Sequence, residues 1–176
     1  GCCSYHADDV EVRRYFLNVL NVGMSANIVA LANKKCTIFA KVIYRVRALL
    51  HLLFRRQNFG MRFRLNNQLV EKKFMMLCIG NSTGYGMTPS AVPYNGWLDV
   101  SVIYRPELLQ LFQGLWLLVH GRLLNLKKVV KPYRTRKVKI LRAQNAAISL
   151  DGRQLYADCP LDVRILPEAL TLIIPK

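Results

Sequence analysis

The best candidate for a catalytic side chain in this sequence is a carboxylate in a predicted turn. Between residues 72 and 157 the acidic residues are Asp99, Glu107 and Asp151. Asp151 precedes Gly152, and an Asp-Gly pair between the apolar segments ISL and RQLY is typical of a two-residue hairpin turn. A turn exposes its side chains, whereas Asp99 lies in a segment that alternates as a strand. Asp151 is therefore the better candidate for accepting a proton, although the pair would also serve as a plain turn.

A second candidate is a polar loop that contains several glycines. Residues 74–100 read FMMLCIGNSTGYGMTPSAVPYNGWLDV, so an apolar segment enters a long loop and then returns to strand-like sequence. Long loops on a rigid scaffold frequently carry function. The alternative is an ordinary surface loop, because the glycine pattern alone is weak. The chain contains no GxxxxGK[ST], GxGxxG or Gly-Gly-Asp-Gly motif with which backbone N–H groups hold nucleotide phosphates.

The charge of the chain narrows the class of partner. The 176 residues include 26 Lys and Arg against 10 Asp and Glu, which gives a net charge of +16 and attracts nucleic acid or an anionic bilayer. Stacking on nucleic acid requires aromatic residues among the charges, and only Tyr133 qualifies in the most basic run. Anionic lipid needs charge alone, at roughly 1 kcal/mol per residue. That run has eight basic residues and no acid: Lys127, Lys128, Lys131, Arg134, Arg136, Lys137, Lys139 and Arg142.

Cysteine and histidine spacing argues against a zinc site. The five cysteines include no C-x-x-C pair, and the three histidines never fall four residues apart. We expect free thiols in a reducing cytoplasm and no disulfide framework. The start of the chain lacks the pattern of a signal peptide. The longest uncharged helical run, residues 108–121, is shorter than the roughly 18–20 residues that span a bilayer, so we expect the protein to lie on membranes at most.

The periodicity predicts a β-rich α+β domain that comprises residues 1–176. Many short strands indicate a sandwich or a barrel, with two or three helices inserted. A hairpin turn is expected at residues 66–68. We expect helices at residues 26–33, 37–54 and 108–124. We expect strands at residues 12–22, 61–66, 72–79, 97–104, 126–130, 137–141, 147–150, 154–157, 161–165 and 170–174.

Several ordered motifs resemble the C-terminal domain of the diacylglycerol kinase and sphingosine kinase-like lipid kinases of bacterial type. They are FLNV with Gly23, IGN followed by Tyr85-Gly86, NGWLDV at residues 95–100, Asp151-Gly152, and PEALTLIIP at residues 167–175. The resemblance covers nearly the whole chain. It implies an antiparallel β-sandwich lobe that completes an active-site cleft. It also implies a separate N-terminal lobe with a Gly-Gly-Asp-Gly-Thr motif. ATP and magnesium would bind mainly to that lobe.

The resemblance implies a role for five residues. Asp151 would be the catalytic carboxylate that helps to deprotonate a lipid hydroxyl, because phosphoryl transfer requires mainly positioning and charge neutralisation. Asn81, Gly84, Gly86 and Gly152 would shape the cleft near the nucleotide. The implied partners are a lipid substrate, the N-terminal lobe and an anionic membrane at the inner, cytoplasmic face, without nucleic acid.

Four positions depart from the family pattern and leave alternatives open. Ser25 lies in a Gly-Phe-Asp-like segment, Tyr94 and Asn95 replace an Asp-Asp pair, and Arg153 replaces the Glu of Asp-Gly-Glu. Magnesium prefers carboxylate oxygens, so no metal ligand is assigned. An ion pair with Arg153 would lower the basicity of Asp151. The alternatives are a lipid-binding or regulatory pseudokinase lobe and a basic nucleic-acid-binding β domain.

Overall fold

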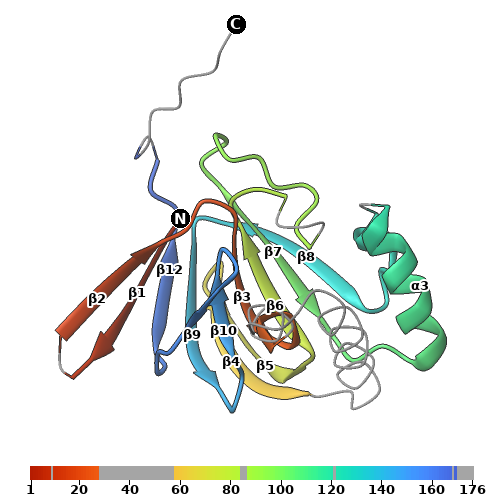
Figure 1. Cartoon of the computed structure of the whole chain (residues 1–176), viewed down its shortest axis with the longest axis horizontal. Coiled ribbons are helices and arrows are strands. Elements are labelled where there is room, and N and C mark those ends of the chain that lie inside the picture. The colour runs from red at the N-terminus through yellow and green to blue at the C-terminus, as the bar shows by residue number, and fades with distance from the viewer. Residues whose placement is uncertain (9, 28–57, 84–86, 121, 168, 170–176) are drawn as a thin grey trace, which may run out of the picture.

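Apolar and charged side chains alternate along the strand β4 (Phe59–Leu65), which shows how this sequence forms its layers. Met61, Phe63 and Leu65 are buried, whereas Arg62 and Arg64 are exposed. Because successive side chains of a strand point to opposite faces, β4 presents one apolar face to a core and one charged face to solvent. Figure 1 shows the result in the computed structural model, which is two antiparallel sheets packed as a sandwich. The predicted β-rich fold is confirmed.

The structure describes residues 1–8, 10–27, 58–83, 87–120, 122–167 and 169. Sheet A has the strand order β2-β1-β12-β9-β4-β5, and sheet B has the order β11-β10-β3-β6-β7-β8. Besides β4, sheet A contains β1 (Cys2–Ala7), β2 (Val10–Tyr15), β5 (Gln68–Phe74), β9 (Lys137–Ala143) and β12 (Leu161–Arg164). Sheet B contains β3 (Val19–Gly23), β6 (Met76–Gly80), β7 (Leu98–Ile103), β8 (Val130–Thr135), β10 (Ile148–Leu150) and β11 (Arg153–Leu155). The helices are α3 (Leu108–Val119) and the short 3₁₀ helix η2 (Leu123–Asn125).

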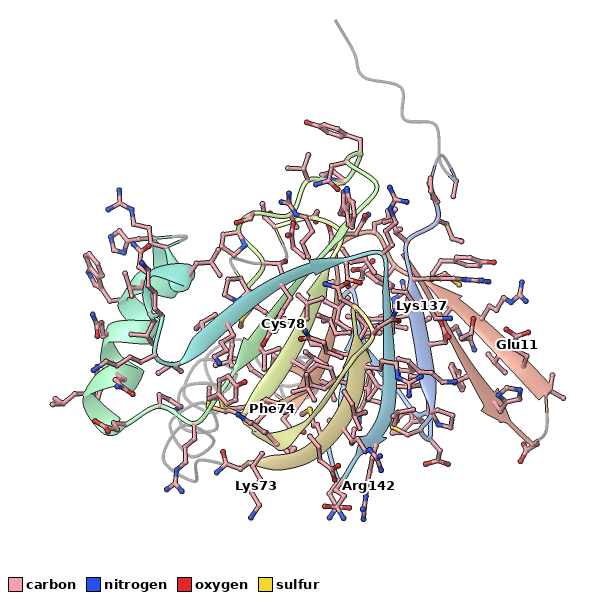
Figure 2. All side chains as sticks on the ribbon, turned by 180° about the vertical axis from the view of Figure 1, so that it is seen from behind. Glu11, Lys73, Phe74, Cys78, Lys137 and Arg142 are labelled. Carbon is pink, nitrogen blue, oxygen red and sulfur yellow. The ribbon has the colours of Figure 1, made fainter. Side chains whose placement is uncertain are left out.

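Two apolar clusters cover the two faces of sheet B. The first lies between the sheets, where Phe63 and Phe74 of sheet A, with ring centroids 5.4 Å apart, belong to the same cluster as Leu77 of sheet B. The second lies on the outer face of sheet B and includes Cys78, Leu117 of α3 and Val129. In Figure 2, Phe74 and Cys78 lie inside the molecule. The central strands of sheet B, β3, β6 and β7, are therefore buried on both faces, and their ends are places where polar groups can gather.

Two predicted strands are wrong in the same way. Residues 12–22 form β2 and β3, with a break at residues 16–18, and residues 72–79 form β5 and β6, with a break at Met75. In both cases the first strand belongs to sheet A and the second to sheet B. The chain must bend to change sheets, and an unbroken apolar run does not reveal where it bends.

The predicted strand at residues 126–130 is also wrong. The N–H groups of Val129 and Val130 both donate to the carbonyl of Leu126 at 2.9 Å, which makes a turn before β8. The predicted helix at residues 108–124 ends earlier, as α3, and η2 follows it. The apolar residues of this turn pack on the outer face of sheet B, which explains their strand-like composition.

The predicted turns are confirmed. Asn66 and Asn67 have φ angles of 48° and 63°, and Asp151 and Gly152 have φ angles of 43° and 81°. Positive φ at both central residues is typical of the turns that match the twist of a hairpin. The predicted helices at residues 26–33 and 37–54 and the strand at residues 170–174 lie outside the described residues, apart from a helical start at residues 24–27. Within the described part of the chain, no helix is long and apolar enough to cross a bilayer.

Two cysteines are predicted to resist alkylation in the folded protein. Burial raises the pKa of the Cys3 and Cys78 thiols to about 12. The thiolate is the reactive form, and at pH 8 its fraction would be on the order of 10⁻⁴. We expect N-ethylmaleimide at pH 8 to leave both residues unlabelled, as read by peptide mass spectrometry, and to label them in urea. Rapid labelling of Cys78 in the native protein would contradict its placement in the apolar cluster.

Candidate functional site

The carboxylate of Asp151 binds the backbone that enters β3. Its Oδ2 accepts a hydrogen bond from the N–H of Leu17 at 2.6 Å. Its Oδ1 accepts from the N–H groups of Asn18 at 2.9 Å and Val19 at 2.8 Å. The N–H of Asp151 donates to the carbonyl of Val19 at 3.0 Å. Leu17 and Asn18 precede β3, so the carboxylate replaces the strand partners that their N–H groups would otherwise have.

Asn81 binds the same segment from the other side. Its Nδ2 donates to the carbonyl of Leu17 at 3.0 Å, and its N–H donates to the carbonyl of Asn18 at 2.8 Å. Ser82 adds a hydrogen bond from its hydroxyl to Asn18 Oδ1 at 2.8 Å. Asn81 is 7% exposed, and its Oδ1 is buried with no hydrogen-bond partner among the described residues.

The structure therefore brings Asp151 and Asn81 together through residues 17 and 18. Gly152 lies beside them as the second turn residue, and a Cβ there would meet no atom within 4 Å, so its positive φ rather than crowding favours glycine. Gly84 and Gly86 lie outside the described residues. The sequence analysis missed the role of the backbone of Leu17 and Asn18, because no side-chain pattern marks a backbone donor.

The strand pairing places a charged pair at the same end of sheet B. Val19 pairs with Gly80, Gly80 pairs with Asp99, and Asp99 pairs with Arg134. Arg134 Nε lies 3.0 Å from Asp99 Oδ1, and the Asp99 side chain is 12% exposed. The other oxygen of Asp99, Oδ2, is buried without a hydrogen-bond partner among the described residues. Asp99 is thus less accessible than Asp151, as the strand pattern predicts.

A pocket of about 390 Å³ lies over this charged pair. The loop that joins β6 to β7 provides Thr88, Pro89 and Ser90, and Leu124 of η2 lines another side. The remaining lining residues come from β7 and β8: Asp99, Val100, Ser101, Pro132, Tyr133 and Arg134. Figure 1 shows this loop at one end of the sandwich. The pocket has both polar and apolar walls, which suits an amphipathic ligand.

The start of the loop is fixed by a close approach between Gly80 and Thr88. A Cβ on Gly80 would lie 2.1 Å from Thr88 Oγ1, so any side chain there would displace Thr88. The Thr88 hydroxyl donates to the carbonyl of Ser82 at 2.8 Å. Thr88 is a further site residue that the sequence analysis missed. The close packing holds the pocket wall against β6, the strand that ends at Gly80.

The departures from the family pattern have local structural roles. Ser25 is buried, with its Oγ 3.9 Å from Cys78 Sγ. Asn95 Oδ1 accepts from the N–H of Trp97 at 2.9 Å, which closes a turn, and Tyr94 is 88% exposed. Arg153 is exposed, and within the described residues it makes no ion pair with Asp151. The loss of acids at these positions leaves the fold intact.

The described residues of this lobe do not fit a magnesium site by themselves. They contain no group of three or more His, Cys, Asp or Glu side chains that could hold a metal ion. Asp99 faces a guanidinium, and Asp151 faces three N–H groups, so both carboxylates already bind positive partners. Hard cations require several free oxygen ligands.

The substitution Asp151→Asn is predicted to destabilise the fold. An amide has one acceptor oxygen, so its NH₂ would face at least one backbone N–H and leave it without a partner. Such a loss costs about 1–3 kcal/mol. We expect this decrease in the free energy of unfolding by urea denaturation, whereas the exposed Asp158→Asn should change it by less than about 0.5 kcal/mol. Equal stability of the two variants would show that the carboxylate does not hold residues 17–19.

Comparison with known proteins agrees with this arrangement. Residues 18–174 match the family of the YegS C-terminal NAD kinase beta sandwich-like domain. Three solved structures from Bacillus anthracis strain Sterne, each named as a diacylglycerol kinase, share the fold. Their TM-scores are 0.60, 0.56 and 0.53, at 15%, 12% and 15% sequence identity. Each alignment covers 94% of this chain and 55%, 53% or 52% of the other, so the chain spans about half the length of those proteins.

No curated protein matches the sequence. The family match covers most of the chain and includes β3, the polar loop and the Asp151 turn. The resemblance found in the sequence is confirmed. The chain belongs to the YegS C-terminal NAD kinase beta sandwich-like family, and it shares its fold with about half of each of these solved structures.

Proposed function

We propose that this chain is the substrate lobe of an ATP-dependent lipid kinase that phosphorylates a lipid hydroxyl at the cytoplasmic face of a membrane. The family and the solved structures with the same fold support a kinase-like protein. The observation that carries the finer proposal is the geometry of Asp151. Its carboxylate is held by three backbone N–H groups at the end of sheet B where Asn81 and the polar loop also lie.

The hydrogen bonds of Asp151 leave room for one further donor. A carboxylate has about four acceptor positions, two on each oxygen. Oδ1 accepts two N–H groups and Oδ2 accepts one, so one position on Oδ2 remains for a substrate hydroxyl. The three donors also fix the orientation of the carboxylate, and phosphoryl transfer depends mainly on such positioning. Asp151 would accept the hydroxyl proton as the lipid oxygen attacks the phosphate.

The nucleotide would come from the N-terminal lobe of the parent protein. Magnesium bound there with ATP would neutralise the charge of the phosphates. In this lobe, Asn81 holds the segment before β3 through its hydrogen bonds to the carbonyls of Leu17 and Asn18. Asn81 would thus orient the cleft, and Gly152 would keep the Asp151 turn in its positive-φ conformation.

The basic surface supports a location at an anionic membrane. All eight basic residues between positions 127 and 142 are exposed. They do not form one face, because they are divided between the turn before β8, β8 at the edge of sheet B, and β9 within sheet A. As a set they therefore provide long-range attraction rather than one docking face.

The proposal is tested by phosphate transfer from labelled ATP to a lipid extract, with the intact parent protein and its Asp151→Asn variant. We expect loss of the carboxylate to decrease kcat by about 10²–10⁴-fold. Because this variant also loses stability, a matched control is needed. Asn145 has a φ of 52° in the turn between β9 and β10, and Asn145→Val should cost roughly 1–2 kcal/mol without touching the site.

Both variants should be assayed where circular dichroism shows them folded. If Asn145→Val keeps full activity and Asp151→Asn loses it, the loss is due to the missing carboxylate and not to decreased stability. Equal activity of wild type and Asp151→Asn would overturn the catalytic role. Absence of transfer by a folded wild type that binds ATP would favour a non-catalytic lipid-binding lobe, in which Asp151 serves only to hold residues 17–19.

A further inference from the structure

The helix α3 exposes an apolar stripe that the fold does not use. Leu109, Phe112 and Trp116 are 83%, 62% and 58% exposed. Their spacing of three and four residues places them on one face of the helix. The opposite face packs against the sandwich, because Leu117 is buried in the outer cluster and Gly114 lies against Leu126. Figure 1 shows α3 at the side of the molecule, beyond β8.

The surroundings of the stripe are basic. The helix itself, LLQLFQGLWLLV, contains no charged residue. Arg105 precedes it and Arg122, Lys127 and Lys128 follow it, and all four are exposed. The only acid in the sequence between Asp99 and Asp151 is Glu107. Leu, Phe and Trp on one face with flanking Lys and Arg are typical of helices that lie in the headgroup region of an anionic bilayer.

We propose that Leu109, Phe112 and Trp116 insert into an anionic bilayer and make α3 the membrane-docking surface of this lobe. The inference rests on the proposed function in one respect, namely that a membrane lipid is the substrate. Charge complementarity selects the occupant: Arg105, Arg122, Lys127 and Lys128 face lipid phosphates while the apolar stripe enters the acyl boundary.

The position of the helix connects this surface with the pocket. η2 follows α3 directly, and its Leu124 lines the pocket whose opposite walls carry Asp99 and Arg134. A protein docked through α3 would therefore hold the pocket close to the bilayer surface. Docking on a membrane explains why three large apolar side chains are exposed, since such exposure is otherwise unfavourable.

The test is co-sedimentation of the intact protein with vesicles of phosphatidylcholine alone or with added phosphatidylglycerol. We expect binding to the anionic vesicles that weakens as salt rises. The triple variant Leu109→Ser, Phe112→Ser and Trp116→Ser should bind roughly tenfold more weakly or worse. The matched control Val10→Ser, Tyr15→Ser and Leu69→Ser removes three exposed apolar side chains from sheet A and should bind as wild type does.

A second measurement tests whether Trp116 enters the bilayer. Brominated lipids quench tryptophan that reaches the acyl boundary. We expect quenching that is lost in Trp116→Phe and kept in Trp97→Phe. Wild-type binding by the triple variant would overturn the proposal. So would a change in oligomeric state of that variant on gel filtration without vesicles, because the stripe would then be a protein interface.

The experiments distinguish a failure of the proposed kinase activity from a failure of the proposed membrane docking. Vesicle binding and quenching are measured without ATP, so they support docking even if no lipid is phosphorylated. Conversely, a water-soluble short-chain lipid presented without vesicles should be phosphorylated equally by wild type and the triple variant. A loss of this activity in the triple variant would show that the stripe acts on the active site instead of on the membrane.

Discussion

The contact between the Asp151 carboxylate and the backbone of residues 17–19 is the interaction on which the site depends. The chain leaves sheet A after β2 and joins sheet B at β3, and in the crossing the backbone loses its strand partners. An unpaired N–H costs free energy when it is removed from water. One carboxylate satisfies three such groups, and Asn81 and Ser82 bind the carbonyls and the Asn18 side chain of the same segment. A turn in the last third of the chain thus fixes the start of sheet B.

The two sheet crossings determine what gathers at this end of the sandwich. Because β3, β6, β7 and β8 are neighbours in sheet B and pair antiparallel, the start of β3 meets the end of β6, the start of β7 and the end of β8. That pairing places Asp99 beside Arg134 and leaves the loop after Asn81 above them. Both faces of sheet B are covered by apolar clusters. Polar chemistry is therefore confined to the strand ends.

Charge and apolar exposure act at different ranges in this lobe. The net charge of +16 acts through its long-range field, and the basic residues in strands β8 and β9 are divided between the two sheets. The stripe on α3 is local and has a definite direction, because Leu109, Phe112 and Trp116 are exposed whereas Leu117 is buried. In the proposed docking, the net charge attracts the lobe to an anionic membrane and the stripe orients it there. Either feature alone would do only one of these two things. Leu124 of η2 and Asp99 of β7 both line the pocket, and Asp99 lies at the end of sheet B where Asp151 binds residues 17–19.

The sequence by itself determined the features that depend on local conformation. Asp151-Gly152 and Asn66-Asn67 form turns because these residue types tolerate positive φ, and the alternation in β4 predicts its buried face. The family could also be identified from ordered motifs. The break at residues 16–18 and at Met75, the three N–H donors of Asp151 and the pairing of Asp99 with Arg134 were decided by the tertiary structure alone. These features join residues up to 134 positions apart. Every residue except proline has a backbone N–H, so side-chain periodicity does not show which of these groups will bind a carboxylate. It also does not show where the chain changes sheets, because the same apolar run fits either sheet.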